Sequence, residues 1–366
     1  MSSDGIRITD PRAVPLGVAA TVRAYVELTK PRIIELLLVT TLPAMVVAAG
    51  GWPGTRLAIA TLFGGALSAG GANTINQVVD RDIDAIMRRT RGRPLPTGRV
   101  GPRAALVFGV VLGGAGFGVL WAAANLLAAS LSTAGLLFYV FVYTLILKRA
   151  TPQNIVIGGA AGAMPALVGW AAVTGSLSLA PWVMFAAVFL WTPAHFWALA
   201  LRHREDYDVA GVPMLPVVVG EAETLAQILR YTVLLVAVSL ALFSLEAVGV
   251  FYLVFAVVLG SGLVSAAMRL RRKPETAMVF FGASNLFLAG LFTAMALDVF
   301  VGWGGELRGL RTAVLVVATA FIVPMAARSA SAELRTGDGR SVVRFVEVLV
   351  PLAGLTALFV AAWVLI

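Results

Sequence analysis

The sequence predicts an all-α protein that crosses a membrane many times, and three observations support this prediction. Hydrophobic residues make up 59% of the 366 residues and charged residues only 13%, whereas soluble domains are about 25% charged. The apolar residues form long blocks, as helices of about 20 residues that span a bilayer require. Lys and Arg gather in alternate connections between these blocks. This composition excludes an ordinary soluble enzyme and a disordered chain.

Eleven apolar blocks are bounded by charged residues or by Gly and Pro. A turn near Glu246 is the only separation between the seventh and eighth blocks. Small residues are frequent within the blocks, and they permit close contact between helices in lipid. We expect spans at residues 33–50, 57–79, 104–124, 126–147, 154–174, 181–201, 231–246, 248–268, 278–301, 310–327 and 343–365.

The distribution of positive charge predicts the orientation. If the N-terminus is cytoplasmic, the cytoplasmic segments hold 25 of the 28 Lys and Arg residues, and the outer segments keep only Arg56, Arg308 and Arg311. Such an asymmetry is typical of membrane proteins. It explains the net charge of +9 without a nucleic-acid partner. We therefore expect a cytoplasmic N-terminus and, because eleven is odd, an external C-terminus.

Cysteine and histidine counts exclude several chemistries. The chain has no Cys and only two His. A disulfide framework, a Cys-ligated zinc site and a thiolate nucleophile are therefore excluded. A His-rich metal site is excluded as well.

Three polar residues lie at the end of the second span. Asn76, Asp80 and Asp84 are spaced i, i+4 and i+8, which places them on one face of a helix. Their oxygen atoms are the hard ligands that Mg²⁺ prefers, together with substrate phosphate oxygens. Asp82 points elsewhere, and for it we favour a solvated helix end.

Arginines follow the acidic triplet directly, at positions 88, 89, 91, 93 and 99. Guanidinium groups bind phosphate in a bidentate manner. Taken alone, they are explained by the positive charge of cytoplasmic loops. Acids for a metal beside arginines for an anion indicate a diphosphate site.

The triplet, followed by RPLPTG at residues 93–98, resembles the first signature of the intramembrane aromatic prenyltransferase superfamily. Within it, residues 80–90 (DRDIDAIMRRT) resemble the protohaem IX farnesyltransferase (haem O synthase) family. Residues 28–33 (LTKPRI) and 143–162 are similar to that family's first span and to its exit from the fourth span. The resemblance covers residues 28–301.

A second motif, at residues 189–216 (FLWTPAHFWALALRHREDYDVAGVPMLP), resembles the signature of the haem family almost residue for residue. His195, Arg202 and Asp206 are spaced i, i+7 and i+11 and share one stripe if the helix continues, whereas His203 lies about 80° away. His195 is a candidate to ligate haem iron, orient a propionate or remove a proton. The alternative is a structural histidine of the core. For His203, a surface role is an equal alternative.

The chain departs from the quinone-type members of the superfamily at this point. Those members carry a second acidic motif, Asp-xxx-Asp. Here Asp206 has Arg202 four positions before it and Ala210 four positions after it. This departure fits the haem family, and Asp206 is kept as an additional metal-ligand candidate.

The resemblance implies a ring of nine transmembrane helices around one cavity, with two extra C-terminal spans. We divide the chain into a cytoplasmic segment (1–29), a prenyltransferase core (30–301) and a C-terminal extension (302–366). The implied reaction transfers farnesyl from farnesyl diphosphate to a vinyl group of haem B, giving haem O for haem A and terminal oxidase biogenesis. Mg²⁺ is the implied cofactor. The implied setting is the cell (inner) membrane, with haem A synthase or oxidase assembly proteins as partners.

The resemblance also implies roles for individual residues. Asn76, Asp80 and Asp84 are the catalytic and metal-binding candidates, joined by Asp206 for the metal. His195 and His203 are the candidates for binding haem. The candidates for binding the diphosphate are Arg32, Arg88, Arg93, Lys148 and Arg202.

Two alternatives remain open from the sequence. One is a prenyltransferase of the quinone or chlorophyll type, against which the sequence around His195 and Asp206 argues. The other is a transporter, in which acids near the middle of a span carry protons or cations. The acidic triplet lies instead at the basic end of its span, which favours chemistry with a metal and an anion.

Overall fold

The computed structural model describes residues 17–301, and within that range it is helical without a strand. The spans expected at 310–327 and 343–365 lie outside the described residues. The helices are α1 (Val18–Thr29), α2 (Pro31–Ala49), α3 (Thr55–Val79), α4 (Arg81–Ile86), α5 (Pro102–Ala123), α6 (Leu126–Leu137), the π-helical η1 (Phe138–Leu147), α7 (Asn154–Thr174), α8 (Leu179–Arg202), α9 (Arg204–Val209), α10 (Leu215–Val218), α11 (Gly220–Ser244), α12 (Val250–Arg272), the 3₁₀ turn η2 (Pro274–Thr276) and α13 (Ala277–Val301).

The predicted fold class, an all-α polytopic membrane protein, is confirmed. Each of the first nine predicted spans falls on a long helix, with α6 and η1 forming one continuous span. Seven helices of the described range are long and apolar enough to cross a membrane. A further pair, Val18–Ile34 and Leu38–Ala49, meets the same criterion together but is bent by 49°.

Two helices differ from a simple apolar span. Helix α3 has 25 residues, and its Gly, Ser, Thr and Asn residues lower its mean hydropathy. Many of these residues are buried, where they pack on neighbouring helices or line a cavity. Helix α11 begins at Gly220, well before the predicted start of that span at 231. Charged residues end the apolar block at 231, but they belong to the same helix. Two of them, Glu223 and Arg230, form an ion pair of 3.1 Å along it.

Helices α3 and α5 approach closely through glycines. A Cβ atom placed on Gly71 would lie 2.6 Å from the Gly109 carbonyl oxygen, and one on Gly116 would lie 2.8 Å from the Gly64 carbonyl oxygen. Backbones can come this near only where side chains are absent. The expected role of small residues in helix contact is therefore observed at this pair.

Asp298 on α13 stabilises the start of a different helix. Its Oδ1 accepts a hydrogen bond of 2.9 Å from the Tyr252 backbone N–H, and its Oδ2 accepts one from Gly249 N–H. These are N–H groups at the start of α12, which have no partner within their own helix. This carboxylate, only 6% exposed, thus has a structural role at the start of α12.

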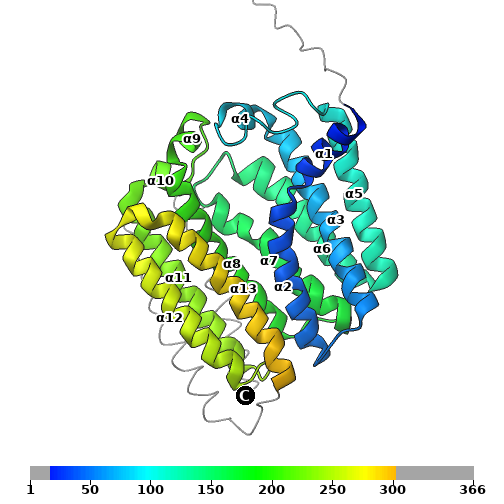
Figure 1. Ribbon diagram of the computed structural model, residues 1–366, viewed down its shortest axis with the longest axis vertical. Helices are drawn as coiled ribbons and strands as arrows, with labels where there is room; N and C mark the ends of the chain where they lie inside the picture. Colours follow the sequence, from blue (N-terminus) through cyan, green and yellow to red (C-terminus); the bar gives the residue numbers. More distant parts are fainter. Residues whose placement is uncertain (1–16, 302–366) are drawn as a thin grey trace, which may run out of the picture.

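The short helices gather at one end of the bundle. Figure 1 shows α1, α4, α9 and α10 together there, above the ends of the long helices. Lys30, between α1 and α2, has a φ of +53°, a left-handed conformation that is uncommon for a residue with a side chain. The acidic triplet belongs to this end, because α3 finishes at Val79 and α4 follows directly.

Candidate active site

One large cavity occupies the bundle and has a volume of about 670 Å³. Residues of α2, α3, α6, η1, α7, α8 and α13 line it, whereas α5, α11 and α12 contribute none of its lining. Its Lys, Arg and Asp lining gathers near α4 and includes Lys30, Asp84, Arg93 and Lys148, with Asn76 beside them. Most of the remaining lining is apolar or small. The cavity therefore offers a charged end and a long apolar body.

The acidic triplet keeps its helical spacing across the junction of α3 and α4. The Asp80 N–H bonds to the Asn76 carbonyl at 2.9 Å, and the Asp84 N–H bonds to the Asp80 carbonyl at 2.8 Å. All three residues are at most 3% exposed. Asn76 Nδ2 donates to Asp80 Oδ2 at 2.7 Å and to Thr144 Oγ1 at 3.1 Å. The sequence spacing therefore brings these three side chains into one buried group.

Each member of the triplet has a cationic partner. Lys30 Nζ donates to Asn76 Oδ1 at 2.8 Å, and Arg93 Nη1 bonds Asp84 Oδ2 at 2.7 Å. Lys148 pairs with Asp80 Oδ2. Lys30 was not assigned a role from the sequence. The one sequence feature that points to Lys30 is its position directly before Pro31, at the start of a span.

The donor set fits a hard divalent cation that also holds a substrate phosphate. Asp80 Oδ1 is buried and has no hydrogen-bond partner among the described residues, although Asp80, unlike Asn76 and Asp84, is not itself among the lining residues of the cavity. No cluster of three or more His, Cys, Asp or Glu able to hold a metal is present in residues 17–301. Asp80, Asp84 and the Asn76 amide oxygen could hold Mg²⁺ only together with substrate phosphate oxygens, which usually complete such sites.

The arginines of this region divide into two groups. Arg32, Arg89 and Arg93 line the cavity. Arg88 is exposed and is not among the lining residues. From the sequence we predict Arg88 rather than Arg89 at the diphosphate, because nothing in the sequence shows which of two adjacent side chains faces inward once the helix has ended.

Arg89 joins the loop after α4 to α9. Its Nη2 donates to the Tyr207 hydroxyl at 2.6 Å, and its guanidinium lies 4.8 Å from the centre of the Tyr207 ring. Tyr207 is buried and lines the cavity. Burial raises the pKa of its hydroxyl, which therefore stays neutral. The pair connects two polar loops, residues 87–101 between α4 and α5 and residues 203–214 between α8 and α10.

The predicted stripe through His195, Arg202 and Asp206 is wrong as a continuous helical face. Helix α8 ends at Arg202, and His203 leaves the helical conformation with φ −113° and ψ 26° before α9 begins. Arg202 is exposed, and Arg202, His203 and Asp206 are all absent from the cavity lining. Partial burial and nearby Arg89 lower the pKa of His203. Of the residues after Leu201 on this motif, Tyr207 and Met214 line the cavity instead.

His195 remains in the cavity wall. It is 6% exposed, and its Nδ1 lies 2.8 Å from Ser284 Oγ on α13. Its ring is stacked on Trp191 on one side and on Phe281 on the other. The sequence could not identify Ser284 and Phe281, because neither belongs to a motif.

The π-helical segment η1 supplies another wall. Tyr139 and Tyr143 line the cavity with their rings stacked 5.3 Å apart. In a π-helix the backbone bonds run from i to i+5, and here the Lys148 N–H bonds to the Tyr143 carbonyl at 2.8 Å. Segments of this kind are frequent at functional sites. This one delivers Thr144 to Asn76 and Lys148 to Asp80.

Asp82 lies outside the buried group, as its position off the triplet predicted. It pairs with Arg149, which also bonds the Val79 carbonyl. The carboxylate is 57% exposed. The hydrogen bond from Arg149 lowers the pKa of Asp82 to about 2. This pair ties α4 to the residue next to Lys148.

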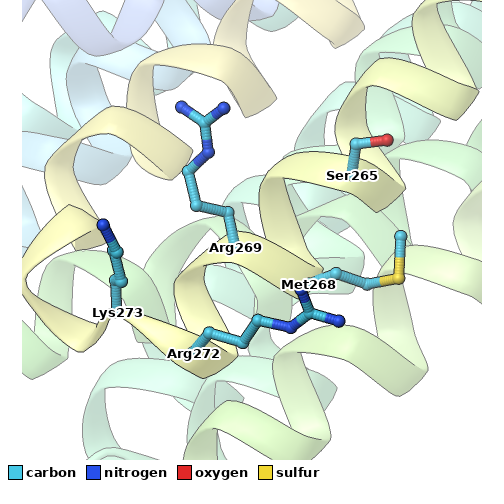
Figure 2. Close-up of a pocket in the computed structure, with 5 residues that line it drawn as sticks. All are labelled: Ser265, Met268, Arg269, Arg272 and Lys273. Carbon is cyan, nitrogen blue, oxygen red and sulfur yellow. The ribbon is translucent and has the colours of Figure 1, made fainter.

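A second hollow of about 330 Å³ lies on the last turns of α12 and is drawn in Figure 2. It is lined by Ser265, Met268, Arg269, Arg272 and Lys273, all exposed. Basic residues at a helix C-terminus complement the partial negative charge there. No acid of the described residues lines this hollow, so it lacks the metal-binding groups of the large cavity.

A helical bundle around a cavity with acids and cations at one end is the architecture of an intramembrane prenyltransferase. The profile of the UbiA prenyltransferase family matches residues 37–291, and the chain belongs to that family. The transporter alternative is thereby set aside. Solved structures agree on the fold: a digeranylgeranylglyceryl phosphate synthase (TM-score 0.64) and a UbiA homolog from Archaeoglobus fulgidus bound to DMAPP and Mg²⁺ (TM-score 0.55). Each is 20% identical; they cover 77% and 75% of this chain, and it covers 99% of each.

Curated relatives give a narrower resemblance and confirm the one predicted from the sequence. The protoheme IX farnesyltransferase of Symbiobacterium thermophilum is 57% identical over 282 residues, which are 76% of this chain and 94% of that protein. Protoheme IX farnesyltransferase 1 of Saccharopolyspora erythraea is 54% identical over 80% of this chain and 94% of its own length. A Thermus thermophilus protoheme IX farnesyltransferase is 54% identical over 76% of this chain. That relative is longer, and this chain spans only 46% of its length.

Proposed function

We propose that the protein transfers the farnesyl group of farnesyl diphosphate to a vinyl group of haem B, releasing diphosphate and forming haem O. The observation that carries the proposal is the buried group of Asn76, Asp80 and Asp84, with its three cations, at the end of an apolar cavity that also holds His195. The protoheme IX farnesyltransferases at 51–57% identity support the choice of haem as acceptor.

The diphosphate would bind at the charged end of the cavity. Arg32, Arg89, Arg93 and Lys148 line that end and carry the positive charge that an anionic leaving group requires. Mg²⁺, held by Asp84 and Asn76 of the lining and by Asp80, which is bonded to Asn76 but is not itself in the lining, would neutralise charge on the phosphate oxygens. Arg88, Arg202, Asp206 and His203 lie outside the lining, so the proposal gives them no contact with substrate.

The reaction begins when the bond between C1 of farnesyl and the diphosphate oxygen breaks. The electron pair leaves with the diphosphate, and the cationic side chains stabilise the charge that develops there. The vinyl π electrons of haem then form the new carbon–carbon bond with C1. Water adds to the resulting cation beside the porphyrin and loses a proton, which leaves the hydroxyethylfarnesyl group. The balance needs no oxidant or reductant.

The apolar body of the cavity protects the farnesyl cation from water. Its walls include small residues of α3 and α7, such as Gly65, Ala72 and Gly162, beside larger apolar groups such as Leu288. A cation that met water early would give farnesol instead of the haem product. Exclusion of water is therefore a requirement of the transfer step.

The protein is a multi-pass membrane protein, and we propose that its charged end faces the cytoplasm of the cell membrane. The topology predicted from the sequence, which assigns 25 of the 28 Lys and Arg residues to cytoplasmic segments, supports this orientation. Both polar loops and α1 lie at that end (Figure 1). Soluble farnesyl diphosphate would then reach the site from the cytoplasm. Haem A synthase or oxidase assembly proteins would receive the product.

The test is a reconstituted reaction. Purified protein is incubated with haem B, farnesyl diphosphate and Mg²⁺, and the porphyrin products are identified by mass. We expect haem O. Transfer to a quinone precursor such as 4-hydroxybenzoate, without any haem product, would overturn the proposal and favour the quinone-type alternative.

A further inference from the structure

Ser284 joins α13 to α8 through two hydrogen bonds. Its Oγ lies 2.8 Å from His195 Nδ1, and its backbone carbonyl accepts a bond of 2.8 Å from Trp191 Nε1. Trp191 and His195 are one turn apart on α8, so a single residue holds both. All three are buried, and Trp191 and His195 also line the cavity.

The faces of the His195 ring are both covered. The Trp191 ring lies 4.1 Å from it at an interplanar angle of 21°, and the Phe281 ring lies 4.1 Å away at 26° on the other side. A porphyrin therefore has no face of this imidazole on which to stack. The edge of the ring is the part left for a ligand in the cavity.

The Ser284 hydroxyl decides which ring nitrogen carries the hydrogen. Its Oγ lies 2.7 Å from the Phe281 carbonyl, which can only accept, so the single hydroxyl hydrogen points there. The same oxygen then accepts from His195 Nδ1–H. In a neutral imidazole with hydrogen on Nδ1, the lone pair is on Nε2. That Nε2 has no hydrogen-bond partner in the part of the chain that the structure describes.

We propose that Ser284 is a positioning residue that presents the His195 Nε2 lone pair to the cavity, where it binds the iron of the haem acceptor. The inference rests on the proposed function, and it selects one of the three roles considered for His195. A donor to a haem propionate would need its hydrogen on Nε2. A general base would become an imidazolium, and no carboxylate within residues 17–301 is bonded to this ring to stabilise that charge.

The residue that holds the second nitrogen of a metal-bound histidine fixes the ring and its tautomer. Loss of such a partner typically weakens metal binding about 10- to 100-fold. A carbonyl or carboxylate is the usual partner, and here a hydroxyl fixed by its own helix serves the same purpose. Ser284 would thus act on the iron without touching it.

The experiment compares two probes, ferric haem B and metal-free protoporphyrin IX, titrated into the purified full-length protein in detergent. In wild type we expect a haem absorption spectrum with a histidine-ligand signature, and His195→Ala should abolish it. Ser284→Ala should weaken haem binding about tenfold and shift the Soret band. Ser284→Thr, which keeps a hydroxyl, should restore much of the signature. Protoporphyrin has no iron, so its affinity should be the same in every variant.

Ser239→Ala is the matched control. Ser239 is also a buried helical serine, but its hydroxyl donates to the Leu235 carbonyl of its own helix, at 2.8 Å, and lies away from the cavity lining. This variant should bind both probes as wild type does. Unchanged protoporphyrin binding in the other variants shows that they are folded.

Two results would overturn the inference. Parallel losses of haem and protoporphyrin affinity in His195→Ala and Ser284→Ala would mean that these residues only shape the cavity. A haem spectrum that His195→Ala leaves unchanged would mean that iron is not bound there. If haem O still forms while His195→Ala leaves the haem spectrum unchanged, the proposed function stands and the inference is refuted. If the haem spectrum depends on His195 but no farnesylated product forms, the proposed function is refuted and the inference stands.

Discussion

Lys148 pairs with Asp80, although the two follow the ends of different helices, η1 and α3, and lie 68 positions apart in the chain. The same Asp80 oxygen accepts from Asn76, while its other oxygen has no partner among the described residues. On the proposed function, a metal–diphosphate complex brings both signs of charge to this pair. The metal can take the carboxylate while the phosphate takes the ammonium group, so neither buried charge is left alone.

Asp80→Asn tests the metal assignment. We expect turnover to fall about 100-fold or more, the loss typical of removing one preorganised electrostatic group. The remaining activity should need more Mg²⁺, which is measured as haem O formed over a Mg²⁺ titration. Asp82→Asn is the control, because Asp82 is 57% exposed and pairs with Arg149. Near-normal turnover of Asp80→Asn at limiting Mg²⁺ would refute the assignment.

Lys30→Met tests a residue that no sequence argument assigned. A hydrogen bond to a charged group contributes about 1.5–3 kcal/mol, so kcat/KM for farnesyl diphosphate should fall about 10- to 100-fold. Haem affinity should change little, because the Lys30 contact is with Asn76 and not with α8. Arg23→Met, on an exposed side chain of α1, should leave both values unchanged. Loss of haem affinity with normal kcat/KM would place Lys30 at the acceptor instead.

Asp298→Ala should destabilise the bundle without touching the chemistry. The Gly249 and Tyr252 N–H groups would lose their partner at a cost of about 1–3 kcal/mol each. The apparent melting temperature in detergent should drop by about 5 °C or more. Asp208→Ala, at an exposed position, is the control. An unchanged melting temperature would show that water replaces the carboxylate at no cost.

Gly71→Ala tests the close approach of α3 and α5. The added Cβ would lie 2.6 Å from the Gly109 carbonyl oxygen, which is backbone and cannot rotate away. Overpacking of this kind costs about 1–3 kcal/mol. Thermal unfolding measures the loss. Gly114→Ala on α5, where a Cβ meets no atom within 4 Å, should be neutral or slightly stabilising. Equal stability of the two variants would contradict the packing.

The pair of Asp82 and Arg149 predicts a dependence of stability on pH. The folded-state pKa of Asp82 is about 2, below its ordinary value of 3.8. A carboxyl with a lowered pKa stabilises the folded state above pH 4, and this contribution is lost as pH falls from about 4 to 2. Because the pair is exposed, its contribution is at most about 1 kcal/mol. Wild type and Asp82→Asn should therefore differ at pH 6 and converge near pH 2, as measured by chemical unfolding.

The positions and helical type of the first nine predicted segments followed from the sequence, because a bilayer demands long apolar helices and charged residues interrupt the apolar blocks at few places. The start of α11 did not, since its polar first turns lie beyond the apolar block. The triplet of Asn76, Asp80 and Asp84 was also predictable. Its spacing matches a helical repeat, and the backbone keeps that repeat across the end of α3.

The tertiary structure alone decided which side chains meet the triplet and His195. Lys30, Lys148 and Ser284 come from segments far away in the chain, and no local period encodes those contacts. The end of α8 removed Asp206 from the predicted stripe, because His203, outside the helical conformation, rotates every residue after it. Arg202 is still in α8 but is exposed and outside the cavity lining. The sequence by itself determined a membrane bundle with an acidic stripe, through short-range periodicity and composition. Packing between helices determined the cation on each acid and the orientation of the histidine, because those depend on distances across the bundle.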